Sequence, residues 1–187
     1  GTIGEEFTIW LQLKTIADIG IIGLPNAGKS SLLASITSAT PKIANYKFTT
    51  LNPNLGVAVY DDKEITLADI PGLIEGAHEG KGLGDKFLAH IERCKILLHL
   101  VDFTDKNWFE NYKTVRNEIG KYDKKISSKT EIIVISKADL ILSDKEDKIK
   151  EIKNKLNSNI FVISSFNNEG IEGLMDNLFN SIIINND

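Results

Sequence analysis

The sequence predicts an α/β fold: a mostly parallel, six-stranded sheet with one antiparallel strand and helices on both faces. Apolar segments of strand length alternate with amphipathic segments of helical length, which is typical of a parallel sheet covered on both sides. Asp61-Asp62 is a hairpin signal that joins two strands and makes one of them antiparallel. Glycine-rich or polar motifs directly follow four strands, where open α/β sheets bind ligands.

The first expected strand is the apolar segment Ile16 to Ile22, which follows an arm or lead-in strand that starts at Phe7. A helix is expected from Gly28 to about Ser38 because its apolar residues recur at helical spacing. The later segments, in chain order, are a loop from Pro41 to Pro53, strands Leu55–Tyr60 and Glu64–Ile70, a glycine-rich segment Pro71–Gly84, helix Asp85–Glu92, strand Ile96–Val101, helix Asn107–Tyr122, strand Glu131–Ile135, helix Asp144–Leu156, strand Ile160–Ile163 and helix Ile171–Ile183.

Composition and charge narrow the class of protein. A chain of 187 residues fits one domain, alone or with a short arm, and its net charge of −4 gives no general attraction to nucleic acid. The single cysteine, Cys94, excludes a disulfide framework and suits a reducing cytoplasm, where we expect a packed thiol. No apolar run approaches the ~20 residues that span a bilayer, and no signal peptide is evident. We therefore expect a cytoplasmic protein without a membrane partner. We also expect a monomer.

A phosphate-binding loop is the strongest motif. The pattern G-x-x-x-x-G-K-S/T is matched by Gly23-Leu24-Pro25-Asn26-Ala27-Gly28-Lys29-Ser30. A strand precedes it and helical spacing follows from Ser31, a context that a chance glycine-containing turn would lack. Backbone N–H groups of the loop and the start of the helix attract phosphate oxygens. We expect Lys29 to reach the outer phosphates and the Ser30 hydroxyl to ligate Mg²⁺.

A second motif, Ser136-Lys137-Ala138-Asp139, follows the strand at Glu131 and is similar to the guanine motif N-K-x-D. The Asp139 carboxylate can accept hydrogen bonds from two adjacent guanine N–H donors, whereas adenine would leave buried polar groups unpaired. The aliphatic stem of Lys137 can lie over the base. Alone, the pattern also fits a capping turn after a strand. Ser136 replaces the usual Asn, and a hydroxyl makes fewer hydrogen bonds than an amide.

Three further segments complete the predicted site. Asp69-Ile70-Pro71-Gly72 follows a strand as a D-x-x-G switch motif does, although a surface Asp before a Pro-Gly turn is the alternative. We expect Asp69 to hold Mg²⁺ through water and the Gly72 N–H to contact the γ-phosphate. Thr50 is the candidate switch threonine. The backbone of Ser164-Ser165-Phe166 can offer N–H groups to guanine O6.

Six runs of residues together form a distinctive pattern: Asn26, Phe48-Thr49-Thr50-Leu51, Pro53-Asn54-Leu55-Gly56, Asp69-Ile70-Pro71-Gly72-Leu73-Ile74-Glu75-Gly76-Ala77-His78, Gly80-Lys81-Gly82-Leu83-Gly84 and Phe87-Leu88-Ala89-His90-Ile91-Glu92-Arg93-Cys94. These runs, above all the segment that begins at Asp69, resemble the Obg family of GTPases, and the resemblance covers about residues 13 to 184. It implies a Ras-like P-loop GTPase fold, GTP hydrolysis with Mg²⁺, and a role in assembly of the large ribosomal subunit with links to stress and growth control. Residues 1–12 are then a linker or the remnant of an N-terminal domain, and 13–187 the guanine-nucleotide-binding domain.

The motifs and the resemblance together predict a GTP or GDP site. Lys29, Thr50 and Gly72 are the expected catalytic residues, and Ser30 and Thr50 the expected Mg²⁺ ligands. The expected nucleotide-binding residues are Gly23, Leu24, Pro25, Asn26, Ala27, Gly28, Lys29, Ser30, Ser31, Phe48, Thr49, Thr50, Leu51, Asn52, Asp69, Ile70, Pro71, Gly72, Ser136, Lys137, Ala138, Asp139, Ser164, Ser165 and Phe166.

Hydrolysis is expected to be slow. Leu73 stands where Ras-like proteins have a water-orienting Gln, and an aliphatic chain cannot orient water. A partner, a backbone group, His78 or a monovalent cation would have to assist. Similarity to GTPases that carry an Asn at the position of Asn26 makes K⁺ a candidate, with Asn26 as one ligand. Two alternatives remain open. One is a nucleotide-dependent binding module with negligible hydrolysis; the other is a metabolic kinase, against which the guanine motif argues.

Overall fold

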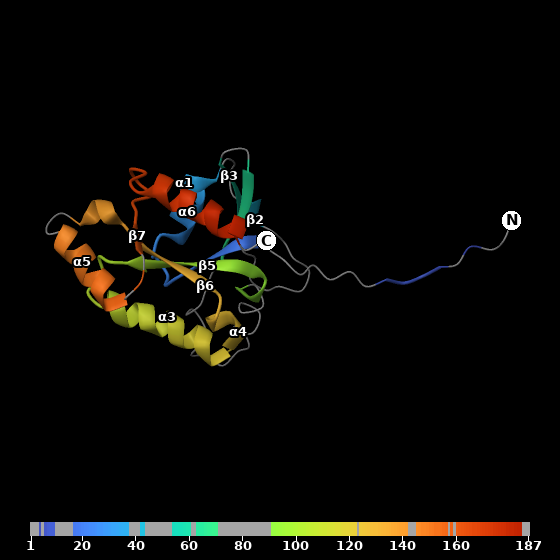
Figure 1. The fold of residues 1–187 in the computed structure, drawn as a ribbon, viewed down its shortest axis with the longest axis horizontal. Coiled ribbons are helices and arrows are strands. Elements are labelled where there is room, and N and C mark those ends of the chain that lie inside the picture. Colours follow the sequence, from blue (N-terminus) through green and yellow to red (C-terminus); the bar gives the residue numbers. More distant parts are fainter. Residues whose placement is uncertain are drawn as a thin grey trace.

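A single sheet runs through the molecule, flanked by helices (Figure 1). The computed structural model describes residues 4, 6–9, 17–37, 42–43, 54–60, 63–70, 91–122, 124–141, 145–156, 158 and 160–184. The strands are β1 (Ala17–Ile22), β2 (Lys42–Ile43), β3 (Asn54–Tyr60), β4 (Lys63–Asp69), β5 (Cys94–Asp102), β6 (Thr130–Ser136) and β7 (Ile160–Val162). The helices are α1 (Lys29–Ile36), α3 (Trp108–Tyr122), α4 (Lys124–Ser127), the one-turn η2 (Ala138–Leu140), α5 (Lys145–Leu156) and α6 (Ile171–Ile184).

The strands lie in the order β2-β3-β4-β1-β5-β6-β7. β1 pairs in parallel with β4 and β5, and β5, β6 and β7 continue the parallel pairing. β3 is antiparallel to both of its neighbours, as the predicted hairpin requires. The predicted fold class, a mostly parallel sheet with one antiparallel strand and helices on both faces, is therefore confirmed.

One strand and two short helices were not predicted. The sequence indicated a loop from Pro41 to Pro53, but Lys42 and Ile43 within it form β2 against the start of β3. Two residues are too few to give a periodic signal, so the sequence did not predict this strand. The sheet therefore has seven strands where six were expected. The one-turn helices α4 and η2 have four and three residues, so they are also too short to give a periodic signal and were not predicted. Of the predicted helix at residues 85–92, only Ile91 and Glu92 are described, and both are helical.

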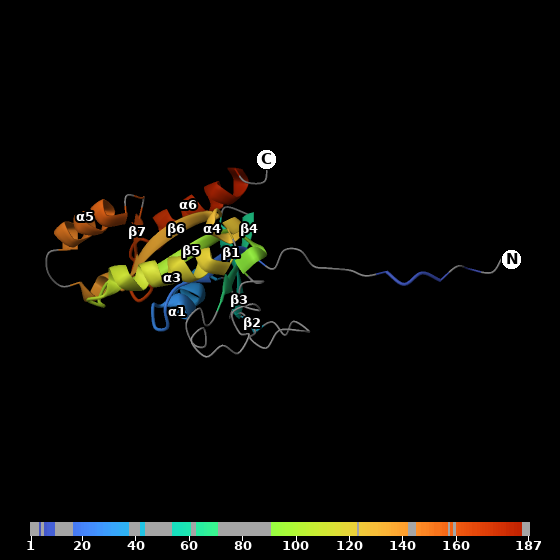
Figure 2. The same cartoon turned by 90° about the horizontal axis from the view of Figure 1, so that it is seen from below.

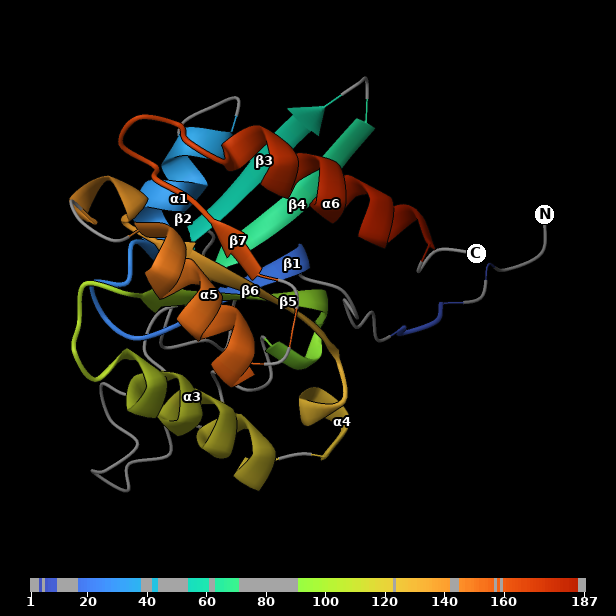
Figure 3. The ribbon, with the colours of Figure 1, turned by 60° about the vertical axis from the view of Figure 1, so that its left-hand side comes forward.

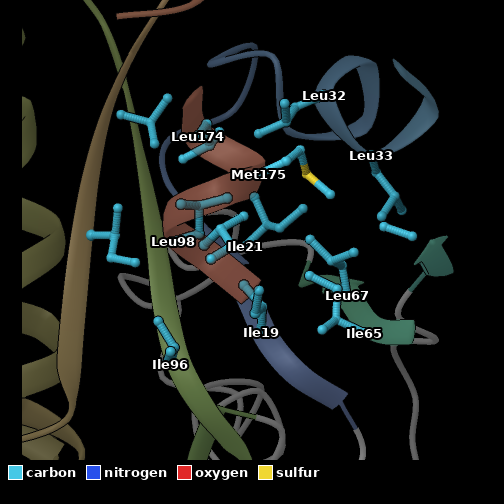
Figure 4. Packing of buried hydrophobic residues seen from close by; sticks show 14 of the residues in the cluster. Ile19, Ile21, Leu32, Leu33, Ile65, Leu67, Ile96, Leu98, Leu174 and Met175 are labelled. Atoms are coloured by element: carbon cyan, nitrogen blue, oxygen red, sulfur yellow. The ribbon is translucent and has the colours of Figure 1, made fainter. Parts of the chain in front are cut away.

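The two faces of the sheet bury separate clusters of apolar side chains. On one face, Ile19, Ile21 and Leu98 pack against α1 and α6 (Figure 4). On the other face, α3, α4 and α5 cover β5 and β6 with Val115 and Ile152 among the buried residues. Figure 2 shows α3 and α6 on opposite sides of the sheet. Each fully buried aliphatic side chain contributes about 1.5–3 kcal/mol, so this core fixes the strands that carry the motifs.

The register of the strands brings their carboxyl ends to one edge. Ile21 of β1 lies opposite Asp69 of β4, and Asp102 of β5 lies opposite Ser136 of β6. The loops that follow β1, β5, β6 and β7 accordingly leave the sheet on the same side, at the left of Figure 3. Within the part of the chain that the structure describes, no helix is both long and apolar enough to cross a membrane.

Candidate nucleotide-binding site

The phosphate loop has a conformation that most residues cannot adopt. Gly23, Asn26 and Gly28 have φ angles of 146°, 63° and 93°. A Cβ atom at Gly23 would lie 2.5 Å from the carbonyl oxygen of Leu100 on β5, so only glycine fits beside that strand. The loop then enters α1 at Lys29, with Gly28 as its N-cap. Its curled backbone and the helix N-terminus form the anion-binding arrangement that the sequence predicted.

Lys29 folds back over this loop. Its Nζ donates to the carbonyl oxygens of Gly23 and Leu24, at 3.1 and 3.0 Å. The ammonium group is thus held at the mouth of the loop by the backbone. A cation in this position can contact the outer phosphates of a bound nucleotide.

Ser30 and Asp69 meet although they are 39 residues apart in sequence. The Ser30 hydroxyl donates to Asp69 Oδ2 over 2.6 Å. Asp69 is 3% exposed at the end of β4, and its Oδ1 is buried with no hydrogen-bond partner among the described residues. A hydroxyl and an unsatisfied carboxylate beside a phosphate loop are the oxygen donors that Mg²⁺ prefers. The donor set therefore fits the predicted metal.

The base motif lies beside the phosphate loop. Ser136 is buried at the end of β6, and a Cβ added to Gly28 would lie 3.9 Å from its Cβ atom. The Ser136 hydroxyl donates to Val101 O at 3.3 Å. Asp139 is half-buried in η2. The structure thus brings the two predicted motifs together, with the Ser136 hydroxyl bonded to β5.

Lys137 is joined to a residue that was not predicted as part of the site. Its backbone is left-handed, with φ of 60°, and its Nζ donates to Asp102 Oδ2 over 2.5 Å. Burial alone would raise the pKa of Asp102, but hydrogen bonds from Lys137 and Thr104 outweigh burial and hold that pKa below its usual value. The sequence signal for Asp102 was its place at the end of an apolar strand, next to the strand of the base motif.

The loop after β7 is fixed by its own hydrogen bonds. The Ala138 N–H donates to Ile163 O at 3.0 Å, which ties this loop to the base motif. The Ser164 N–H donates to Glu169 O, and the Ser164 hydroxyl accepts from the Phe166 N–H at 3.2 Å. Two of the three N–H groups predicted to face guanine O6 are therefore engaged inside the loop. Ser165 remains the candidate donor, and the Phe166 side chain is 90% exposed.

Seven of the predicted site residues lie outside the described part of the chain. These are both switch contacts to the γ-phosphate, from Thr50 and Gly72, and their neighbours Phe48, Thr49, Leu51, Asn52 and Pro71. Ile70 is described and buried, and Ser31 is an exposed residue of α1. Leu24 and Pro25 line a cavity of about 50 Å³ between the phosphate loop and α3.

Fold and site together define a P-loop GTPase domain. The sequence model of the family described as "50S ribosome-binding GTPase" matches residues 18–137, and the chain belongs to this family.

Its relatives agree with the resemblance seen in the sequence: the chain is a homologue of the GTPase Obg. It is 69% identical over 159 residues to GTPase Obg of Pelagibacter ubique, covering 85% of this chain and 48% of that protein. It is 48% identical over 187 residues to GTPase Obg of Orientia tsutsugamushi, covering 97% of this chain and 56% of that protein. The chain thus spans about half the length of the curated relatives it matches.

Solved structures share the fold. Era from Aquifex aeolicus bound to GDP and AlF₄⁻ superposes with a TM-score of 0.68 at 25% identity, over 89% of this chain and 56% of that one. Era in complex with MgGDPNP and nucleotides 1506–1542 of 16S ribosomal RNA gives 0.68 at 25% identity, over 87% and 55%. The cytosolic domain of the FeoB iron transporter of T. maritima gives 0.67 at 19% identity, over 88% and 63%, and shows the fold alone.

Proposed function

We propose that this chain binds GTP and GDP with Mg²⁺, hydrolyses GTP slowly, and acts as a cytoplasmic, monomeric switch in assembly of the large ribosomal subunit. The observation that carries the proposal is the Ser30–Asp69 contact beside the phosphate loop. It joins the phosphate-binding motif to the start of the second switch motif, so a nucleotide bound at one is sensed at the other.

Mg²⁺ binding is proposed at this contact. Ser30 would be a direct ligand, Asp69 would hold the ion through water, and Thr50 would join in the triphosphate state. When bound, the ion neutralises charge on the phosphates. The buried Oδ1 of Asp69 supports the proposal, because a coordinated water would supply the hydrogen bond that this oxygen lacks among the described residues.

Guanine is the proposed base. Asp139 would accept from two ring donors, the Lys137 stem would lie over the base, and the Ser165 N–H would reach O6. Support comes from the hydrogen bond between Ala138 and Ile163, which sets η2 and the loop after β7 side by side. ATP would leave the Asp139 carboxylate without its two donors, which costs affinity.

The proposed hydrolysis is slow because Leu73 cannot orient water. Lys29 of the phosphate loop, with Thr50 and Gly72, would stabilise charge on the γ-phosphate. K⁺ is a candidate activator, with Asn26 as one ligand. Asn26 has a φ angle of 63° inside the phosphate loop. Leu73 also supports a second candidate function, a nucleotide-dependent binding module with negligible hydrolysis.

The ribosomal role is supported by the family, described as 50S ribosome-binding. The relatives are about twice as long as this chain, so segments outside it would contribute to docking. The two switch segments, residues 41–53 and 71–84, would become ordered when a γ-phosphate is bound and would so report its presence to the ribosomal subunit.

Phosphate release from GTP by the full-length protein, with and without purified large ribosomal subunits, tests the proposal. We expect slow release from GTP alone, faster release with the subunits, and no release from ATP. Equal turnover of ATP and GTP would contradict guanine recognition. Binding of GTP with no phosphate release in either condition would establish the binding module instead.

A further inference from the structure

A carboxylate on the neighbouring strand holds Lys137 in place. Asp102 ends β5 directly opposite Ser136 on β6, and its Oδ2 accepts from Lys137 Nζ at 2.5 Å. The Lys137 side chain is 32% exposed and the Asp102 side chain is 21% exposed. The predicted site assigns a role to the stem of Lys137 and none to the group that binds its ammonium.

Asp102 is itself fixed. Its other oxygen, Oδ1, accepts from the Thr104 N–H at 2.9 Å and from the Thr104 hydroxyl at 2.6 Å. These bonds and the one from Lys137 keep the carboxyl ionised at neutral pH, since the pKa of Asp102 is held below its ordinary value despite burial. One oxygen therefore anchors the carboxylate to its own loop, while the second is directed to Lys137.

Both ends of the Lys137 side chain are thus constrained. Its backbone is left-handed, with φ of 60° and ψ of 40°, and Asp102 holds the ammonium at the far end. Lysine is among the residues that lose most rotamer freedom when ordered. A side chain ordered before the ligand arrives does not incur that loss on binding.

We propose that Asp102 is a positioning residue for guanine binding, which acts through Lys137 by holding its aliphatic stem in the place where the base lies. The inference deepens the proposed guanine site and rests on it. Asp102 contacts neither base nor phosphate in this proposal, so its effect requires the Lys137 side chain.

A double-mutant cycle tests this dependence. GDP affinity and dissociation rate are measured for the wild type, Asp102→Asn, Lys137→Ala and the double variant. Asp102→Asn should weaken GDP binding about tenfold, the scale of one lost charge-assisted hydrogen bond. The loss should appear as faster dissociation, preference for GDP over ADP should persist, and the same change in the Lys137→Ala background should have no further effect.

Asp105→Asn is the matched control. Asp105 lies three residues further along the same loop and accepts from the Asn107 N–H at 2.8 Å and from Asn111 Nδ2 at 3.0 Å. Its variant should bind GDP within about twofold of the wild type, well inside the effect of one hydrogen bond. If Asp102→Asn proves unstable, Thr104→Val removes the hydroxyl on Oδ1. It should weaken binding in the same direction, again only when Lys137 is present.

The outcomes separate this inference from the proposed function. A wild-type chain that does not bind GDP would overturn both. If the wild type binds GDP, either unchanged affinity in Asp102→Asn or an equal loss in the two Lys137 backgrounds would overturn the positioning role alone. A loss confined to the background with Lys137, with the GDP affinity of Asp105→Asn within about twofold of the wild type, would establish it.

Discussion

At the residue scale, the contact between Ser30 and Asp69 carries most of the functional argument. Asp69 is 3% exposed and one of its oxygens has no hydrogen-bond partner within the described ranges. Leaving a buried acceptor unsatisfied costs about 1–3 kcal/mol, so a ligand that brings a donor would be stabilised at this point. A hydrated cation beside a phosphate is such a ligand.

Ser30→Ala should remove the effect of Mg²⁺ on GTP binding. The alanine keeps the helix but offers no oxygen to a metal, and we expect Mg²⁺-dependent affinity to fall at least about tenfold. Titration calorimetry with and without Mg²⁺ measures this. Ser35→Ala is the control, since that hydroxyl donates to Leu32 O at 2.9 Å within the same helix. Full Mg²⁺ dependence in Ser30→Ala would remove Ser30 from the ligand set.

Ser136→Asn should tighten nucleotide binding. The hydroxyl of Ser136 reaches Val101 O, whereas an amide could also bond the phosphate loop, since Gly28 is adjacent. One added hydrogen bond contributes about 1 kcal/mol, or roughly fivefold in affinity. The dissociation rate of GDP is the measurement. Faster dissociation would mean that the local geometry is built around serine.

Cys94 should be unreactive in the folded protein. Burial raises the pKa of this thiol to about 12 from 9.0, with Lys129 opposing and Asp18 adding to the shift. The thiolate fraction at pH 8 is then about a thousandfold lower than in the unfolded chain. Because the folded pKa is the higher one, this group favours folding below about pH 9 and loses its contribution as pH rises toward 12. Equal alkylation rates of native and unfolded protein would contradict this prediction.

At the element scale, two glycines near the start of α6 have opposite requirements. Gly170 has φ of 73°, and an added Cβ would lie 2.2 Å from Val162 O on β7. Gly173, inside the helix, would meet nothing within 4 Å. The first glycine lets the loop after β7 turn into α6, whereas the second contributes only chain entropy to the unfolded state.

Gly170→Ala should therefore destabilise the fold by more than about 1 kcal/mol, while Gly173→Ala should stabilise it by about 0.4–1 kcal/mol. Urea unfolding of both variants measures the difference. Two equal effects would show that the left-handed turn does not constrain α6. The loss in Gly170→Ala should also weaken GDP binding, because the same turn holds the loop of Ser164.

The sequence predicted elements with strong local signals and missed those that depend on partners. β1, β5 and β6 are mostly apolar segments of strand length, and the Ser30–Asp69 contact follows from two motifs at the ends of adjacent strands. β2 exists only through its pairing with β3, so no local pattern indicates it. The bond between Lys137 and Asp102 depends on register and on a left-handed backbone, neither of which residue types alone determine.

At the scale of the whole molecule, the sheet holds the phosphate loop, the base motif and the loop after β7 at one edge (Figure 3). The helices on its two faces keep these three segments in a fixed relation. The two switch segments, 41–53 and 71–84, fall almost entirely outside the described residues. Their ordering by a γ-phosphate stays a prediction of the sequence.

Nucleotide selectivity tests the central claim most directly. The measurement is the affinity of the wild-type chain and Asp139→Asn for GDP, XDP and ADP. The wild type should bind GDP and reject ADP. The variant should lose about 2–3 kcal/mol of binding free energy for GDP, since an amide cannot accept from both guanine donors. Its binding of xanthosine diphosphate (XDP) should improve. A wild type that binds ADP as tightly as GDP, or a variant with unchanged affinities for GDP and XDP, would contradict the account.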